Sequence, residues 1–211
     1  MSNNKQMDYK FIAFEGTESA GKTTQIRLLK EYLGKNNIPV HTTTEPTKGP
    51  IGQLIRLALK KEVPVKLETL QTLYAADRME HQIEIDTALN ENKIVLTDRY
   101  YGTSLTYILL EESTKRFYEA LRALNFLARK PDLWVYITCT VEQSLGSVDT
   151  RNGTKEIFDK KEYLEKIYDL YNDFFEKEKE RTKIITIERG NKTAEEMNAE
   201  LVEKLKEIGA I

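Results

Sequence analysis

The sequence has little cysteine and no long apolar run. A single cysteine, Cys139, among 211 residues excludes an intramolecular disulfide and is compatible with a reducing compartment such as the cytoplasm. Because Cys139 follows an apolar run, we expect its thiol to be buried packing and not a nucleophile. No stretch approaches the roughly 18 consecutive apolar residues of a membrane-spanning helix, and residues 1–8 are too polar for a signal peptide. We therefore expect a cytoplasmic protein that does not use a membrane.

The sequence also lacks a clear excess of either positive or negative charge. The 32 Lys and Arg residues nearly balance the 34 Asp and Glu residues, which gives a net charge of −2 and no sign of a nucleic-acid partner. The chain contains no repeat, low-complexity tract or linker that would divide it. We therefore expect one domain, residues 1–211, which is large enough to bury a full sheet with helices on both faces.

A glycine-rich motif, FEGTESAGKTTQ at 14–25, stands out against this background because it contains GxxxxGKT. An apolar run of strand length precedes it, and residues 24–33 carry apolar side chains at helical spacing. This strand–turn–helix context predicts a phosphate-binding loop, with Lys22 on the β- and γ-phosphates of ATP and Thr23 on Mg²⁺. The expected ATP-binding residues are Gly16, Thr17, Glu18, Ser19, Ala20, Gly21, Lys22, Thr23 and Thr24.

Four more apolar runs have strand character. With residues 10–14 they make five predicted strands, the others being 38–43, 93–97, 133–138 and 183–187. Apolar strands separated by helical segments predict an α/β fold, a five-stranded parallel sheet with helices on both faces. In such a sheet ligands lie beyond the carboxyl ends of the strands, which directs attention to Glu45-Pro46 and Asp98-Arg99.

A polar segment follows the fourth strand and a helical stretch. Residues 146–155 are rich in Gly, Asn, Asp, Ser and Thr and include Arg151. A mobile lid at about 146–158, closing over the phosphate loop, would have this composition. An ordinary surface loop would have it equally well.

Residues 65–90 are predicted to form one long helix. Tyr74 and Arg78 are four residues apart and therefore share a face. An aromatic ring that stacks on a base, beside a guanidinium that donates to a base carbonyl such as O4 of thymine, would form a base-reading pair. Pairs with this spacing are also common as plain surface residues.

Taken together, these motifs resemble the thymidylate kinase family, which phosphorylates dTMP with ATP and Mg²⁺. The resemblance runs from Phe11 to about Tyr171 and rests on FEGTESAGKTT, TEP with IGQLIR, LYAADR, DRYYGTSLTY, PDLWVY and TRNGTKEIFDKKEYL. DRY together with LxxADR in this order is specific, whereas the glycine-rich loop and TEP are shared more widely. The resemblance implies the fold of P-loop nucleoside monophosphate kinases, a homodimer, and direct in-line transfer of the γ-phosphoryl group of ATP to dTMP.

The resemblance also implies roles for individual residues. Arg99 would grip the dTMP phosphate, and Asp98 would lie near Mg²⁺ together with Thr23. The family supplies a transition-state arginine from the loop or from the lid, and because the loop here has none, the lid must provide Arg151. Lys22, Arg99 and Arg151 are thus the expected catalytic residues. The expected dTMP-binding residues are Glu18 near the sugar 3′-hydroxyl, Pro46, Arg56, Tyr74, Arg78, Arg99, Ser104 and Tyr107.

The chain departs from the family pattern at two positions. Many members have arginine where Thr44 precedes Glu45-Pro46, and many carry an earlier lid arginine near the position of Ser147. The hold on phosphate is therefore less redundant here than in those members.

Two alternatives keep the glycine-rich loop. In the related deoxynucleoside kinases, a glutamate before proline, as in Glu45-Pro46, deprotonates a sugar 5′-hydroxyl. A hydroxyl needs such a base, whereas a phosphate monoester, with a second pKa of about 6, is already largely dianionic at pH 7 and needs cations. The many arginines and the DRY motif favour a nucleotide acceptor. A nucleotide-binding switch that transfers nothing would have no use for Tyr74 and Arg78.

Overall fold

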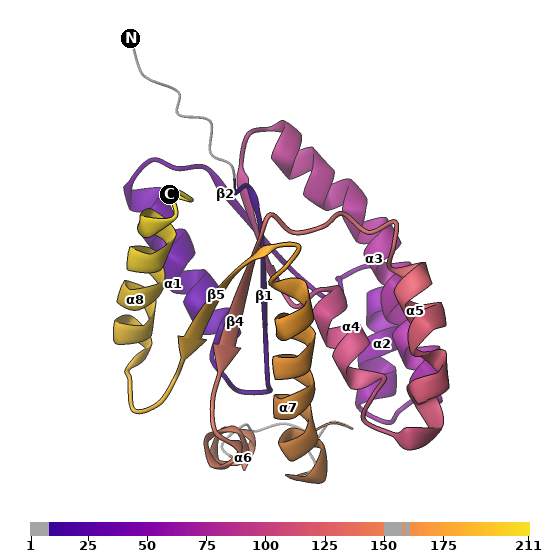
Figure 1. Cartoon of the computed structure of the whole chain (residues 1–211). Coiled ribbons are helices and arrows are strands. Elements are labelled where there is room, and N and C mark those ends of the chain that lie inside the picture. The colour runs from indigo at the N-terminus through magenta and orange to yellow at the C-terminus, as the bar shows by residue number, and fades with distance from the viewer. Residues whose placement is uncertain (1–8, 150–157, 159–160) are drawn as a thin grey trace.

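A five-stranded parallel sheet forms the centre of the molecule. The computed structural model describes residues 9–149, 158 and 161–211 (Figure 1). The strand order is β2-β3-β1-β4-β5, and every neighbouring pair is parallel. The strands are β1 (Phe11–Gly16), β2 (Val40–Thr44), β3 (Ile94–Asp98), β4 (Leu133–Thr138) and β5 (Lys183–Glu188). The five predicted strands are therefore confirmed, with ends that differ by at most two residues.

Burial along the strands follows their place in the sheet. Every residue of the central strands β1 and β4 is buried, whereas the edge strands β2 and β5 are partly exposed. Strands with helices on both faces require continuous apolar runs, because both rows of side chains face a core. Sequences such as LWVYIT in β4 meet this requirement.

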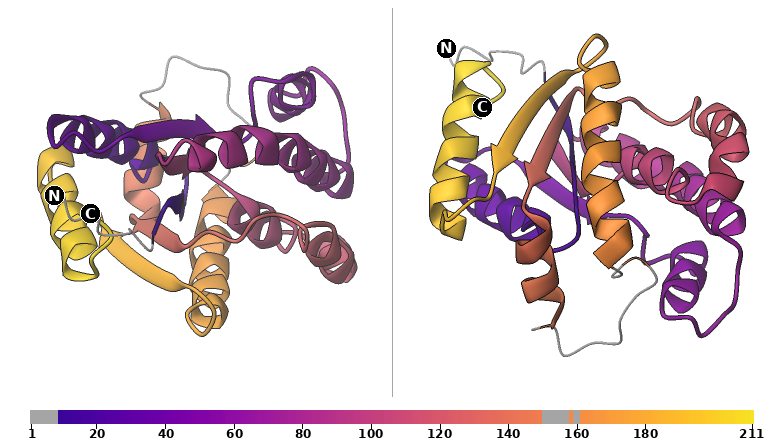
Figure 2. Two further views of the ribbon diagram at one scale, coloured as in Figure 1. Left: turned by 90° about the horizontal axis from the view of Figure 1, so that it is seen from above. Right: turned by 60° about the horizontal axis from the view of Figure 1, so that its bottom comes forward.

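The helices lie on both faces of the sheet (Figures 1 and 2). Helices α1 (Lys22–Lys35) and α8 (Ala194–Glu207) pack together on one face, above a core that includes Leu29, Leu96 and Leu201. A second core on the other face includes Trp134, Tyr101 and Phe174. The remaining helical elements are α2 (Pro50–Leu59), α3 (Leu67–Asn90), α4 (Tyr101–Tyr107), the 3₁₀ helix η1 (Glu112–Phe117), α5 (Tyr118–Leu124), α6 (Val141–Asp149) and α7 (Lys161–Glu178).

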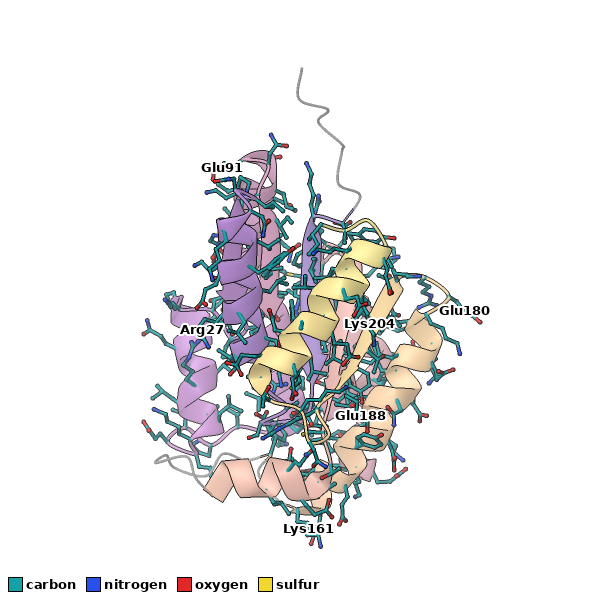
Figure 3. The ribbon with its side chains drawn as sticks, turned by 90° about the vertical axis from the view of Figure 1, so that its left-hand side faces the viewer. Arg27, Glu91, Lys161, Glu180, Glu188 and Lys204 are labelled. Atoms are coloured by element: carbon teal, nitrogen blue, oxygen red, sulfur yellow. The ribbon has the colours of Figure 1, made fainter. Side chains whose placement is uncertain are left out.

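The surface of α1 and α8 is charged and internally paired. Arg27 forms an ion pair with Glu31 on α1, and Lys204 forms one with Glu200 on α8 (Figure 3). Such i,i+4 pairs stabilise a helix only slightly, and they are typical of a solvated face.

Among the residues that the structure describes, no helix is both long and apolar enough to cross a bilayer. The single cysteine, Cys139, is buried, as its sequence context predicts.

Helix α6 extends into the polar segment where we expected turns and a lid. Residues 146–149, which we expected to begin a lid, are helical and form the last part of α6. Turn-forming residues are also common near helix ends, so composition alone does not separate the two states. Arg151 lies outside the described residues, as does most of the expected lid.

Candidate active site

The glycine-rich loop joins β1 to α1 at the carboxyl edge of the sheet, which the right-hand view of Figure 2 brings forward. Gly16 has φ +144°, and a Cβ atom there would lie 2.1 Å from the carbonyl oxygen of Ile137. Gly21 has φ +103° and precedes the first residue of α1. Both positions require glycine, the first because of strain and close backbone approach, the second because of its left-handed conformation.

Lys22 is the first residue of α1 and folds back over the loop. Its Nζ donates to the carbonyl oxygens of Gly16, at 2.9 Å, and Thr17, at 2.7 Å. Burial, with a smaller contribution from the positive charge of Arg99, lowers the pKa of Lys22 to about 8. The ammonium group is thus held at the loop by neutral carbonyl groups and is available to an anionic ligand.

Thr23 and Asp98 meet at the floor of the loop. The Thr23 hydroxyl donates to Oδ2 of Asp98 at 2.5 Å, which joins α1 to the end of β3. Both residues line a cavity of about 490 Å³ together with Glu18, Ser19, Gly21, Lys22, Thr24, Thr44, Glu45 and Arg99. In the described part of the chain, no cluster of three or more His, Cys, Asp or Glu side chains could hold a metal by itself. One hydroxyl and one carboxylate nevertheless fit Mg²⁺, which commonly takes one or two carboxylates, water and phosphate oxygens.

Arg99 follows β3 directly and has a strained backbone with φ +70°. Its guanidinium forms an ion pair with Glu18 of the glycine-rich loop, and it donates to the Thr103 hydroxyl at 3.1 Å. The same group lies 5.8 Å from the centre of the Tyr107 ring, and the Tyr107 hydroxyl donates to Glu18 at 3.3 Å. The predicted residues Glu18, Arg99 and Tyr107 therefore form one cluster.

Glu15 is a buried acid that the sequence reasoning missed. Its Oε1 accepts hydrogen bonds from the backbone N–H groups of Tyr100, at 3.0 Å, and Thr103, at 2.8 Å, at the start of α4. Its Oε2 accepts from the hydroxyl groups of Thr103 and Tyr171. Burial raises the pKa of Glu15 above the ordinary value. A charged residue inside a buried strand was the signal that could have revealed it.

A second cavity, of about 260 Å³, opens beside Arg99. Six of the eight predicted dTMP-binding residues line it, namely Glu18, Pro46, Arg56, Tyr74, Arg99 and Tyr107. The Arg56 guanidinium donates to the carbonyl oxygens of Pro46 and Thr47, so α2 is tied to the turn after β2. The full lining is Glu18, Glu45, Pro46, Arg56, Leu59, Lys60, Gln71, Tyr74, Arg99, Thr103, Tyr107 and Phe158.

Two predicted residues, Arg78 and Ser104, are not in either cavity lining. Arg78 is 1% exposed and forms an ion pair with Oε2 of Glu45 at 2.5 Å, while it also donates to Asn125 and to the Ser104 hydroxyl. The other oxygen of Glu45 lies 3.1 Å from Nδ1 of His81. The predicted base reader is therefore held in a buried network that fixes the turn at Glu45.

Phe158 is the last residue of the expected lid, and the structure describes it. Its side chain is 5% exposed and packs edge-on against Tyr107, with 4.6 Å between the ring centres. The last residue of the segment where we expected a lid thus packs at the second cavity. Arg151 falls outside the described residues, so its predicted role remains a prediction.

Comparison with known proteins gives a consistent result. Residues 14–198 match the sequence model of a family described as thymidylate kinase. A probable thymidylate kinase of Methanococcus aeolicus is 39% identical over 93% of this chain and 95% of its own length. A thymidylate kinase of Desulfotalea psychrophila is 36% identical over 82% of this chain and 83% of its own. The solved structure of Candida albicans thymidylate kinase has a TM-score of 0.83 at 22% identity, covers 96% of this chain and 93% of its own, and shows the same fold.

Proposed function

Because the chain belongs to the thymidylate kinase family, we propose that it transfers the γ-phosphoryl group of ATP to dTMP, giving ADP and dTDP. One observation of the structure carries the proposal. The cavity at the glycine-rich loop and the cavity beside Tyr74 share three lining residues, Glu18, Glu45 and Arg99. A phosphate donor in the first cavity and a nucleotide acceptor in the second would therefore meet at Arg99.

The transfer proposed here needs positioning and positive charge more than proton transfer. A phosphate oxygen of dTMP attacks the γ-phosphorus while the bond to the bridging oxygen of ADP breaks, with no enzyme-bound intermediate. Two anions must approach each other, so Lys22 at the donor and Arg99 at the acceptor would offset their repulsion. Arg151 is proposed to reach the transferring group from the lid.

Thr23 and Asp98 are the residues that would hold Mg²⁺. A hydroxyl donor beside a carboxylate at the phosphate cavity suits this ion, because magnesium completes its shell with water and phosphate oxygens. When bound, the ion would neutralise charge on the β- and γ-phosphates. On the protein side, the short bond from Thr23 to Asp98 keeps both ligands at the end of β3.

The environment of Glu45 argues against a deoxynucleoside kinase. A general base must reach the proton that it removes. Here both carboxylate oxygens already face Arg78 and His81, and the side chain is 1% exposed. Glu45 therefore acts in this proposal as a structural anchor for the turn beside the acceptor.

We further propose a homodimer and a cytoplasmic location, both consistent with the family resemblance. Helices α2 and α3 expose large apolar side chains, namely Leu54, Leu57, Met79 and Ile83. Apolar groups of this size on adjacent helices favour burial against a partner. Sedimentation of the purified protein would test the dimer, and an Ile83→Glu chain that sediments unchanged would argue against α3 as the interface.

A panel of acceptors tests the proposed function. ADP formation from Mg·ATP is measured with dTMP, dUMP, UMP, thymidine or deoxycytidine present, and with no acceptor. The proposal expects the fastest ADP formation with dTMP and little with either nucleoside. Fast turnover of thymidine would favour the deoxynucleoside kinase, and ADP formation that ignores every acceptor would exclude transfer to dTMP.

A further inference from the structure

Helix α3 presents a buried polar stripe toward the acceptor side. Gln71, Tyr74 and Arg78 lie at i, i+3 and i+7 and are all buried, so they share one face of the helix. Asp77 and His81 are buried polar residues of the same helix, and both have described partners, Thr47 for Asp77 and Glu45 for His81. Gln71 differs from all of these.

The Gln71 carboxamide is buried without a hydrogen bond. Its side chain is 0% exposed, and in the described part of the chain neither Oε1 nor Nε2 has a hydrogen-bond partner. Leaving a buried amide unpaired opposes folding, so a leucine or methionine would suit folding better at this position. Buried polar groups that remain unpaired in a native protein call for a specific explanation.

The position of Gln71 supplies that explanation. Among the described residues, the other side chains with an unpaired buried atom are Arg78, through Nε, and Trp134, through Nε1. The remaining guanidinium nitrogens of Arg78 are paired, and Trp134 lies in an aromatic cluster. Gln71 alone of the three lines the acceptor cavity, together with Tyr74.

We propose that the Gln71 carboxamide pairs with the polar edge of the pyrimidine base in this cavity. Thymine presents an N3–H donor between two carbonyl acceptors, and a carboxamide offers one acceptor and an N–H donor in the matching arrangement. Oε1 accepts from N3–H while Nε2 donates to a flanking carbonyl, and the Tyr74 ring covers the face of the base. This inference rests on the proposed function, and it assigns part of base recognition to a residue that touches the cavity, whereas Arg78 lies behind it.

A distinctive result follows from replacing the amide. Gln71→Leu and Gln71→Met should raise the KM for dTMP by about tenfold or more, the scale of one good base contact, while the KM for ATP changes less than twofold. The same variants should melt at the same temperature as the parent protein or higher, because the unpaired amide is gone. A residue with a purely structural role would show a lower melting temperature and equal losses for both substrates. Gln53→Leu is the matched control, since it removes an exposed amide on α2 that only donates to a backbone carbonyl.

N3-methyl-dTMP tests whether Gln71 accepts a hydrogen bond from N3–H of the base. In the parent enzyme the N3-methyl group should raise the KM about tenfold or more over that for dTMP, and in Gln71→Leu this ratio should fall to within about twofold of one. If the parent phosphorylates dTMP but the ratio is the same in both proteins, Gln71 does not read N3 and the inference is wrong. An unchanged KM for dTMP in both Gln71 variants would also overturn it. If the parent enzyme does not phosphorylate dTMP, the proposed function fails first, and the inference falls with it.

Discussion

The cavity at the glycine-rich loop and the cavity beside Tyr74, which we propose as the donor and acceptor cavities, are built in different ways. The glycine-rich loop is one continuous segment, and its shape depends on backbone conformation at Gly16 and Gly21 and on carbonyl groups that receive Lys22. The acceptor cavity combines side chains from the turn after β2 and from α2, α3 and α4, and from the glycine-rich loop. Its shape depends on pairing between residues far apart in sequence, such as Glu45 with Arg78, 33 positions away. Adding a side-chain atom to a glycine should therefore destabilise the loop. Removing one partner of a side-chain pair should destabilise the acceptor region.

The largest effect is expected from Gly16→Ala. The new methyl group would lie 2.1 Å from a carbonyl oxygen of β4 and would require φ +144°, so strain and overlap together should lower the free energy of unfolding by about 4 kcal/mol or more. Gly34→Ala is the control, because beyond the adjoining backbone of its own helix no atom lies within 4 Å of an added Cβ, and inside α1 alanine should stabilise by about 0.5–1 kcal/mol. Chemical denaturation measures both. Equal stability of the two variants would contradict the backbone account of the loop.

Arg78→Met tests the side-chain account of the acceptor region. It leaves the buried carboxylate of Glu45 without its strongest partner and should lower the free energy of unfolding by about 3–5 kcal/mol. Adding Glu45→Gln should recover part of this loss, since the uncompensated charge is removed. Denaturation of the single and double variants gives the coupling directly. Additive losses would mean that the ion pair does not hold the region together.

Arg151→Ala tests whether the lid completes the site. Arginines that stabilise the transferring phosphoryl group contribute about 10³–10⁵ in kcat in related reactions. We expect a loss in kcat of about a hundredfold or more, with little change in the KM for dTMP and only partial recovery with lysine. Lys155→Ala is the comparison, because Lys155 is a second cation in the same polar segment, 146–155. If Arg151→Ala stays within threefold of the parent and Lys155→Ala is crippled, the role belongs to Lys155.

The smallest effect concerns pH at the glycine-rich loop. Because burial lowers the pKa of Lys22 to about 8, the free enzyme should lose this charge as the pH rises, and kcat/KM for ATP should fall about tenfold by pH 9. Stability should not fall for the same reason. Above pH 8 the folded chain binds fewer protons at Lys22 than the unfolded chain, so the contribution of Lys22 to the free energy of unfolding rises with pH. A kcat/KM for ATP that stays flat to pH 9.5 would contradict the lowered pKa.

The difference between local backbone patterns and the pairing of distant side chains also explains what the sequence could predict. The loop, the strands and the long helix are local patterns, so apolar runs and glycine spacing located all five strands and placed α3 within two residues of its start. The cluster of Glu18, Arg99 and Tyr107 was anticipated through the family motifs. Three features were not anticipated, because each depends on which side chains meet across the fold. They are the Glu45–Arg78–His81 network, the hydrogen bonds of Glu15 and the unpaired amide of Gln71. The helical state of residues 146–149 was missed because turn-forming residues also end helices.

The most direct test of the central claim is a competition between two acceptors. The enzyme receives Mg·ATP with equal concentrations of dTMP and thymidine, and the formation of ADP, dTDP and new dTMP is followed by chromatography. If the acceptor is a phosphate held by cations, ADP and dTDP should appear in equal amounts while thymidine is unchanged. Consumption of thymidine with formation of dTMP, or ADP without dTDP, would contradict it.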